Sequence, residues 1–127
     1  MTERTFYPQD FFDNIPESGE VITRFPPEPN GYLHLGHVKA MEIDFDFAKI
    51  NNGKCILRYD DTNPLAEHGE FYDNIREDVE WLGYNYCKIT YTSDYFDELF
   101  NYAIQLINQG DAYICQLSPD DIKSFRN

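Results

Sequence analysis

Positively charged residues are scarce in this sequence of 127 residues. It contains 10 Lys and Arg against 23 Asp and Glu, which gives a formal net charge of -13 at pH 7. A protein that grips a phosphate backbone by itself usually carries the opposite charge, so any contact with nucleic acid must be local or lie elsewhere. An acidic surface also protects an ordinary protein from aggregation, so the charge alone identifies no partner.

Cysteines and long hydrophobic runs are scarce as well. Cys55, Cys87 and Cys115 are odd in number, far apart and free of any CxxC pair or Cys/His cluster, so we predict no metal site and a reduced, cytoplasmic setting. Residues 1–20 contain several acids and no continuous apolar stretch, which argues against a secretory signal or a membrane span. We therefore expect no membrane partner.

The apolar content is high enough for a real core, because 42% of the residues are hydrophobic. Residues 1–20 mix aromatics with prolines without a sustained period, which predicts a leader that packs irregularly. Residues 21–127 then form one domain. A last helix has barely begun when the sequence stops, so we expect a piece of something longer.

Two short β-branched and apolar runs, residues 21–25 and 55–59, predict strands. Between them, apolar residues recur at helical spacing, and Asn51-Asn52-Gly53 supplies a stop that tolerates left-handed backbone. The stripe consists of Val38, Met41, Phe45 and Ala48. A strand, a helix of about three turns and a strand form a βαβ crossover with parallel strands. The predicted class is therefore α/β, with a nucleotide-binding architecture.

Two further helical patterns each stop at a glycine, Gly83 and Gly110. The first consists of Phe71, Ile75, Val79 and Leu82, and the second of Phe96, Leu99, Ala103 and Ile107. Ser93 or Asp94 is expected to cap the second, and Ser118-Pro119 to start a final helix. Trp81, Tyr95 and Phe96 are predicted to be core residues.

The segment that carries chemistry joins the first strand to the first helix, because ligands bind at that point of open α/β sheets. It reads Phe-Pro-Pro-Glu-Pro-Asn-Gly-Tyr-Leu-His-Leu-Gly-His over residues 25–37. Its prolines hold the loop extended, and Gly31 and Gly36 let backbone approach a ligand closely. His34 and His37 lie at the start of the helix, beside backbone N–H groups that favour an anion. Two imidazole donors there suit a phosphate.

This segment closely resembles the HIGH-type signature of the class I aminoacyl-tRNA synthetases, in the form used by the glutaminyl and glutamyl subgroup. The resemblance continues through LRYDDTNP at 57–64, EDVEWLGY at 77–84 and YTSDYFDELFNYAIQLINQGDAY at 91–113. PEPNG, CILRYDDTNP and SDYFDEL look more like the glutaminyl enzymes. The resemblance thus covers nearly the whole chain after residue 20.

The resemblance implies the first half of a Rossmann-type catalytic domain. It also implies ATP-dependent ligation of glutamine to its tRNA through a glutaminyl-adenylate, with ATP (accompanied by Mg²⁺), glutamine and tRNA as partners. The family's second ATP signature, the KMSKS-type lysine loop, has no counterpart here. We therefore expect this chain, taken alone, to be inactive in aminoacylation.

The resemblance also assigns roles to residues. His34 and His37 would stabilise charge developing on the phosphoryl oxygens, Asp60 would bind the α-amino group of glutamine, and Arg24 would lie near the amino acid. The resemblance implies that ATP is contacted by Glu28, Pro29, Asn30, His34, Leu35, Gly36, His37, Val38, Lys39 and Ala40. From the residues alone, one aspartate of Asp60-Asp61 would only form hydrogen bonds with the backbone of its own turn. Arg24 would form a structural ion pair with one of the many acids.

Two alternatives stay open. One is a glutamyl enzyme of the same subgroup, with the same chemistry and a different amino acid. The other is a truncated paralogue that binds nucleotide or a partner without catalysis. Pocket residues beyond Asn127 would distinguish a glutamyl from a glutaminyl enzyme. A continuation of the sequence into a lysine-rich loop would disfavour the truncated paralogue.

Overall fold

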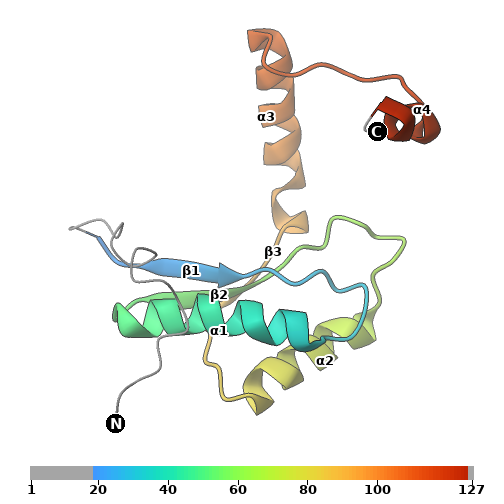
Figure 1. Cartoon of the computed structure of the whole chain (residues 1–127). Coiled ribbons are helices and arrows are strands. Elements are labelled where there is room, and N and C mark those ends of the chain that lie inside the picture. The colour runs from blue at the N-terminus through green and yellow to red at the C-terminus, as the bar shows by residue number, and fades with distance from the viewer. Residues whose placement is uncertain (1–18, 126–127) are drawn as a thin grey trace. The chain divides into compact units, whose positions relative to one another are not determined.

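The computed structural model describes residues 19–125, and the chain divides into two units at Tyr91 and Thr92 (Figure 1). The first unit contains a small sheet with two helices, and the second contains helices only. Nearly all of the predicted leader, residues 1–20, lies outside the described residues. The chemistry expected from the sequence falls in the first unit.

A hydrogen bond connects strand β1 (Ile22–Phe25) to helix α1 (Leu35–Ile50). The Thr23 hydroxyl donates to the Asp44 carbonyl at 2.7 Å. At 16 residues, α1 is longer than the predicted three turns. It stops where expected, since Asn52 adopts φ 52° and a Cβ on Gly53 would lie 2.1 Å from the Val21 carbonyl oxygen. Only glycine fits this turn.

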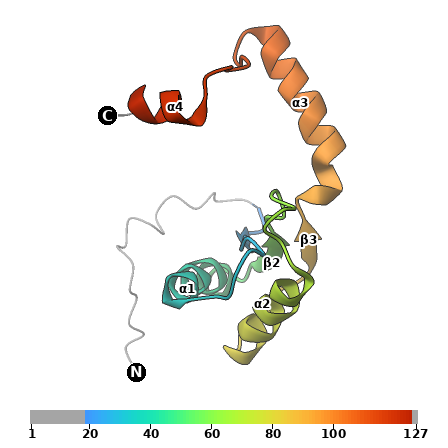
Figure 2. The same ribbon diagram turned by 90° about the vertical axis from the view of Figure 1, so that its right-hand side faces the viewer.

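The sheet has the order β1-β2-β3, with β2 (Lys54–Tyr59) and β3 (Ile89–Tyr91) each parallel to its neighbour. Helix α2 (Gly69–Trp81) connects β2 to β3. Because the strands follow one another across the sheet, their crossover helices fall on the same face. Figures 1 and 2 show α1 and α2 together on that face. This alternation confirms the predicted α/β class with parallel strands.

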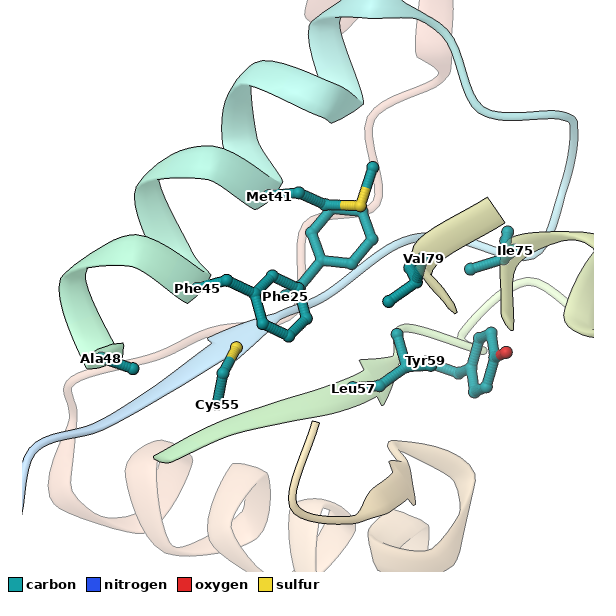
Figure 3. Close-up of a cluster of buried hydrophobic side chains, with 9 residues drawn as sticks. All are labelled: Phe25, Met41, Phe45, Ala48, Cys55, Leu57, Tyr59, Ile75 and Val79. Carbon is teal, nitrogen blue, oxygen red and sulfur yellow. The ribbon is translucent and has the colours of Figure 1, made fainter. Parts of the chain in front are cut away.

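The core lies between the sheet and the two helices (Figure 3). Its buried residues are Phe25, Met41, Phe45, Ala48, Cys55, Leu57, Tyr59, Ile75 and Val79. Three members of the predicted stripe of α1 and two of the pattern of α2 are among them. The prediction that Trp81, Tyr95 and Phe96 are core residues was wrong, since they are 84%, 40% and 45% exposed. Trp81 is the last residue of α2, where the helix turns it outward.

The second unit begins with a short 3-10 helix, Ser93–Tyr95, which runs into α3 (Phe96–Gln109). Ser93 and Asp94 therefore lie inside that turn, and the residue before α3 is Tyr95, which makes no side-chain cap. Gly110 ends α3 with φ 84°, as its position predicted. Helix α4 (Pro119–Phe125) follows. Within residues 19–125, no helix is long and apolar enough to cross a bilayer.

Candidate nucleotide-binding site

Two loops meet at the carboxyl edge of the sheet, one after β1 and one after β2. Parallel strands present their carboxyl ends at the same edge, so the loops start side by side. The Asp60 N–H donates to the Pro27 carbonyl at 2.9 Å, and the His68 N–H donates to the Pro29 carbonyl at 3.4 Å. Two main-chain hydrogen bonds therefore join the loop after β1, residues 26–34 (the signature loop), to the loop that carries Asp60.

The first part of the signature loop alternates between buried and exposed side chains. Pro27 and Pro29 are buried, whereas Glu28 and Asn30 are exposed. The Asn30 side-chain amide donates to Glu28 Oε2 at 2.5 Å. Because proline fixes φ, this segment is held extended with its polar side chains outward. Of the residues expected along ATP here, Pro29 contributes loop shape, and the other two contribute polar groups.

His34 and His37 form a reciprocal cap at the start of α1. His34 Nδ1 accepts from the Gly36 N–H at 3.0 Å, and His37 Nδ1 accepts from the His34 N–H at 3.1 Å. The His34 carbonyl also accepts from the His37 N–H at 2.8 Å. The sequence placed both rings at this helix start, as the structure does. Two of the backbone amides expected to face a ligand, however, already donate to His34.

The cap fixes which ring nitrogen carries the proton. Because both Nδ1 atoms accept a hydrogen bond, each neutral ring holds its hydrogen on Nε2. The ring centroids lie 4.0 Å apart. Partial burial and, secondarily, the charge of His34 lower the pKa of His37, which favours its neutral form. The pair therefore offers two Nε2–H donors at the positive end of a helix dipole.

Gly36 leaves room for the His34 ring. A Cβ at this position would lie 2.8 Å from His34 Cε1 and 3.0 Å from His34 Nδ1. Carbon atoms in contact prefer a separation of about 3.5 Å or more. Glycine is thus needed here for the orientation of a side chain, and its φ is not in the left-handed region.

Tyr32 attaches the signature loop to the start of α2. Its hydroxyl donates to Glu70 Oε1 at 3.3 Å, and its ring meets Phe71 edge-on at 5.2 Å between centroids. Glu70 raises the pKa of Tyr32, so the phenol stays neutral. Sequence reasoning missed this contact, because nothing local links residues so far apart in the chain.

The loop after β2 is ordered by an acid that the sequence analysis did not single out. Glu67 accepts from the Asn63 N–H at 2.6 Å and from the Tyr72 hydroxyl at 3.3 Å. The two neighbouring aspartates differ in environment, since Asp61 is 7% exposed and Asp60 is half-buried at the rim. Asp60 is therefore the aspartate better placed to meet a ligand.

Arg24 lies one residue before the end of β1 and is exposed. Burial raises the pKa of Asp44 on α1 to about 6, and the charge of Arg24 works in the opposite direction. The positive charge of Arg24 thus acts on Asp44, and the structural ion pair expected for Arg24 from the residues alone stays a prediction. Its role toward an amino acid stays a prediction.

The remaining residues expected along ATP lie on the first two turns of α1. Val38 and Ala40 are half-buried against the core, whereas Lys39 is exposed and Leu35 is 86% exposed. A cavity of about 310 Å³ adjoins His34, between the start of α1 and the end of α2. Its lining includes Leu33, Leu35, Val38, Met41, Asp78, Trp81 and Leu82.

Within residues 19–125, no group of three or more His, Cys, Asp or Glu side chains is arranged so that it could hold a metal ion. The chemistry on offer is that of hydrogen-bond donors. The donors are two imidazole N–H groups, a helix N-terminus and the exposed side-chain amide of Asn30, while the Glu28 carboxylate beside Asn30 is an acceptor. The donors suit an anionic ligand.

Comparison with known proteins gives consistent findings. The family described as "tRNA synthetases class I (E and Q), catalytic domain" matches residues 20–127. The chain is 57% identical over 108 residues to the glutamine--tRNA ligase of Lupinus luteus, covering 85% of this chain and 14% of that protein. It is 47% identical over 134 residues to that of Cronobacter sakazakii, covering 99% and 24%.

A solved structure is similar as well. The crystal structure of the glutamate-tRNA synthetase from Elizabethkingia anophelis superimposes with a TM-score of 0.75 at 30% identity, over 85% of this chain and 24% of that one. The chain spans between 14% and 24% of the length of the two ligases named above.

Proposed function

Because the chain belongs to the family of class I tRNA synthetases (E and Q), as part of their catalytic domain, we propose that the loops after β1 and β2 bind ATP. The whole protein would use this ATP to join glutamine to its tRNA through a glutaminyl-adenylate. The glutamine carboxylate would attack the α-phosphate, pyrophosphate would leave, and the acyl group would pass to the terminal adenosine of tRNA. In this proposal, residues 21–127 form the first half of the catalytic domain.

The single observation that carries this proposal is the reciprocal cap of His34 and His37. Because each Nδ1 accepts a backbone hydrogen bond, each neutral ring carries its hydrogen on Nε2. Both rings can therefore donate to a ligand while they are uncharged. Donors held in place before the reaction stabilise developing charge most effectively, and losing one typically costs roughly 2.7 to 4 kcal/mol of transition-state stabilisation. Neither histidine need act as a base.

In this proposal, the other residues contact different parts of the two substrates, ATP and glutamine. Glu28, Asn30 and the first turns of α1 through Lys39 and Ala40 would contact ATP, with Gly36 giving room for the nucleotide. Mg²⁺ would come with the phosphates, since magnesium in such sites is held largely by substrate oxygens. Asp60 would bind the α-amino group of glutamine. Arg24 would line the amino-acid side.

Titration calorimetry on the 127-residue chain tests the proposal. ATP and a non-hydrolysable glutaminyl-adenylate analogue should both bind, and His34→Ala or His37→Ala should weaken binding about tenfold or more. His68→Ala is the matched control, because His68 precedes α2 and makes no side-chain cap. Equal weakening by all three substitutions, or binding unaffected by any, would count against the site.

The glutamyl alternative keeps one specific observation in its favour, the similarity to a solved glutamate-tRNA synthetase. Identities of 47% and 57% to glutamine--tRNA ligases favour glutamine. Parallel titrations with glutaminyl- and glutamyl-adenylate analogues distinguish the two. Tighter binding of the glutamyl analogue would reverse the assignment.

A further inference from the structure

A second cavity lies at the end of the sheet remote from the signature loop. Its volume is about 670 Å³, and it lies among the start of β2, the end of α1 and the segment before β3. The lining includes Phe45, Asp46, Ala48, Lys49, Gly53, Lys54, Cys55, Leu82, Gly83, Tyr84, Asn85, Tyr86 and Cys87. The proposed function uses none of these residues.

Two cysteines that are far apart in sequence, Cys55 and Cys87, both line this cavity. The Cys87 N–H donates to the Cys55 carbonyl at 2.8 Å, so their backbones are direct neighbours. Residues that face each other across a sheet ladder have Cα atoms about 4.5–5.5 Å apart, and a disulfide requires about 4.4–6.8 Å. Both thiols are free, Cys55 buried and Cys87 exposed. Spacing along the chain gave no sign of this pair.

We propose that Cys55 and Cys87 form an oxidisable pair, which a small disulfide such as oxidised glutathione converts into an intramolecular disulfide. In the first step the Cys87 thiolate attacks one glutathione sulfur, forming a mixed disulfide and releasing one glutathione thiolate, which takes up a proton. In the second step the Cys55 thiol gives up its proton and attacks the Cys87 sulfur. A Cys55–Cys87 bond forms and the second glutathione leaves.

The surroundings fit this order of events. Cys87 is accessible, whereas burial, the main cause, raises the pKa of the Cys55 thiol and makes it the poorer first nucleophile. Lys49 lines the same cavity, where its charge suits a carboxylate of glutathione, whereas Lys54 is already paired with Glu20 at 2.7 Å and Asp46 adds one negative charge to the lining. The volume also suffices for a ligand of that size.

The test is oxidation of the folded 127-residue chain in a glutathione redox buffer, followed by acid quenching, alkylation of remaining thiols and peptide mapping by mass spectrometry. The wild type and Cys115→Ser should each form one Cys55–Cys87 disulfide. Cys55→Ala should stop at a mixed disulfide on Cys87. Cys87→Ser should protect Cys55 from oxidation at least tenfold.

A thermal melt of the oxidised wild type supplies a second measurement that needs no variant. The new bond encloses α2 and restricts the unfolded chain, so the midpoint should rise by roughly 5 °C or more. Accumulation of mixed disulfide without the Cys55–Cys87 bond would overturn the proposal. So would pairing with Cys115 to an equal extent, or formation of the bond only in denaturant.

Discussion

The substitution Gly36→Ala separates the stability of the first unit from the function of its site. The added Cβ would lie 2.8 Å from His34 Cε1, so the ring must retreat by about 0.7 Å to reach an ordinary contact. His34 Nδ1 would then lose its hydrogen bond from the residue 36 N–H, now 3.0 Å long. Loss of such a cap costs about 1 kcal/mol.

Alanine also gains up to about 1 kcal/mol of helix propensity over glycine, so the two effects on stability nearly cancel. We therefore expect the free energy of unfolding of Gly36→Ala to stay within about 1 kcal/mol of wild type in urea. Ligand binding has no such compensation. A displaced donor should weaken ATP binding about tenfold, because a hydrogen bond to a charged group is worth about 1.5 kcal/mol or more.

Two assays check this together. Titration calorimetry gives the affinity for ATP, and nitrogen chemical shifts of the imidazoles report whether His34 still accepts at Nδ1. Gly31→Ala is the matched control, since a Cβ there meets nothing within 4 Å. Unchanged His34 shifts and unchanged affinity in Gly36→Ala would refute the reasoning. A loss of stability beyond about 2 kcal/mol would mean instead that Gly36 is required for folding.

Substitutions in the framework of the first unit give further tests. Thr23→Val removes the hydroxyl that donates to the Asp44 carbonyl and should lower the free energy of unfolding in urea by about 1 kcal/mol. Burial raises the Asp44 pKa from 3.8 to about 6, so the folded chain retains a proton that the unfolded chain releases. Stability should therefore fall as pH rises through that interval, a slope that Asp44→Asn should abolish in denaturation measured at several pH values. Gly53→Ala should destabilise by more than about 2 kcal/mol, because its Cβ would lie 2.1 Å from the Val21 carbonyl oxygen; a melting temperature equal to wild type would exclude that clash. Ile75→Ala should cost about 2–5 kcal/mol in the same assay, and a smaller loss would mean that the core relaxes around the cavity.

Elements with a strong local pattern could be predicted from the sequence, and elements defined by their partners could not. The stripe of α1 and its Asn52-Gly53 stop are local features, so they were predicted correctly. Strand β3 is only three residues long, and its identity comes from pairing with β2. The exposure of Trp81 likewise depends on where α2 ends relative to the sheet, which no periodicity reports.

The candidate site divides in the same way. The position of His34 and His37 at a helix start followed from the pattern of prolines and glycines. Their reciprocal cap did not, because cap positions usually hold Ser, Thr, Asp or Asn. The resemblance named Asp60, but the residues alone could not distinguish it from Asp61, since the difference between the two is burial. Tertiary contacts set that difference in burial.

The two ties between the loops, from Asp60 to Pro27 and from His68 to Pro29, use only main-chain atoms. Every residue has a carbonyl, and every residue but proline has an N–H, so these ties do not depend on which side chains the loops carry. Glu28 and Asn30 point away from the ties and are exposed. In the proposed ATP site, substitutions of these two side chains are therefore expected to change ligand preference while the backbone frame stays intact.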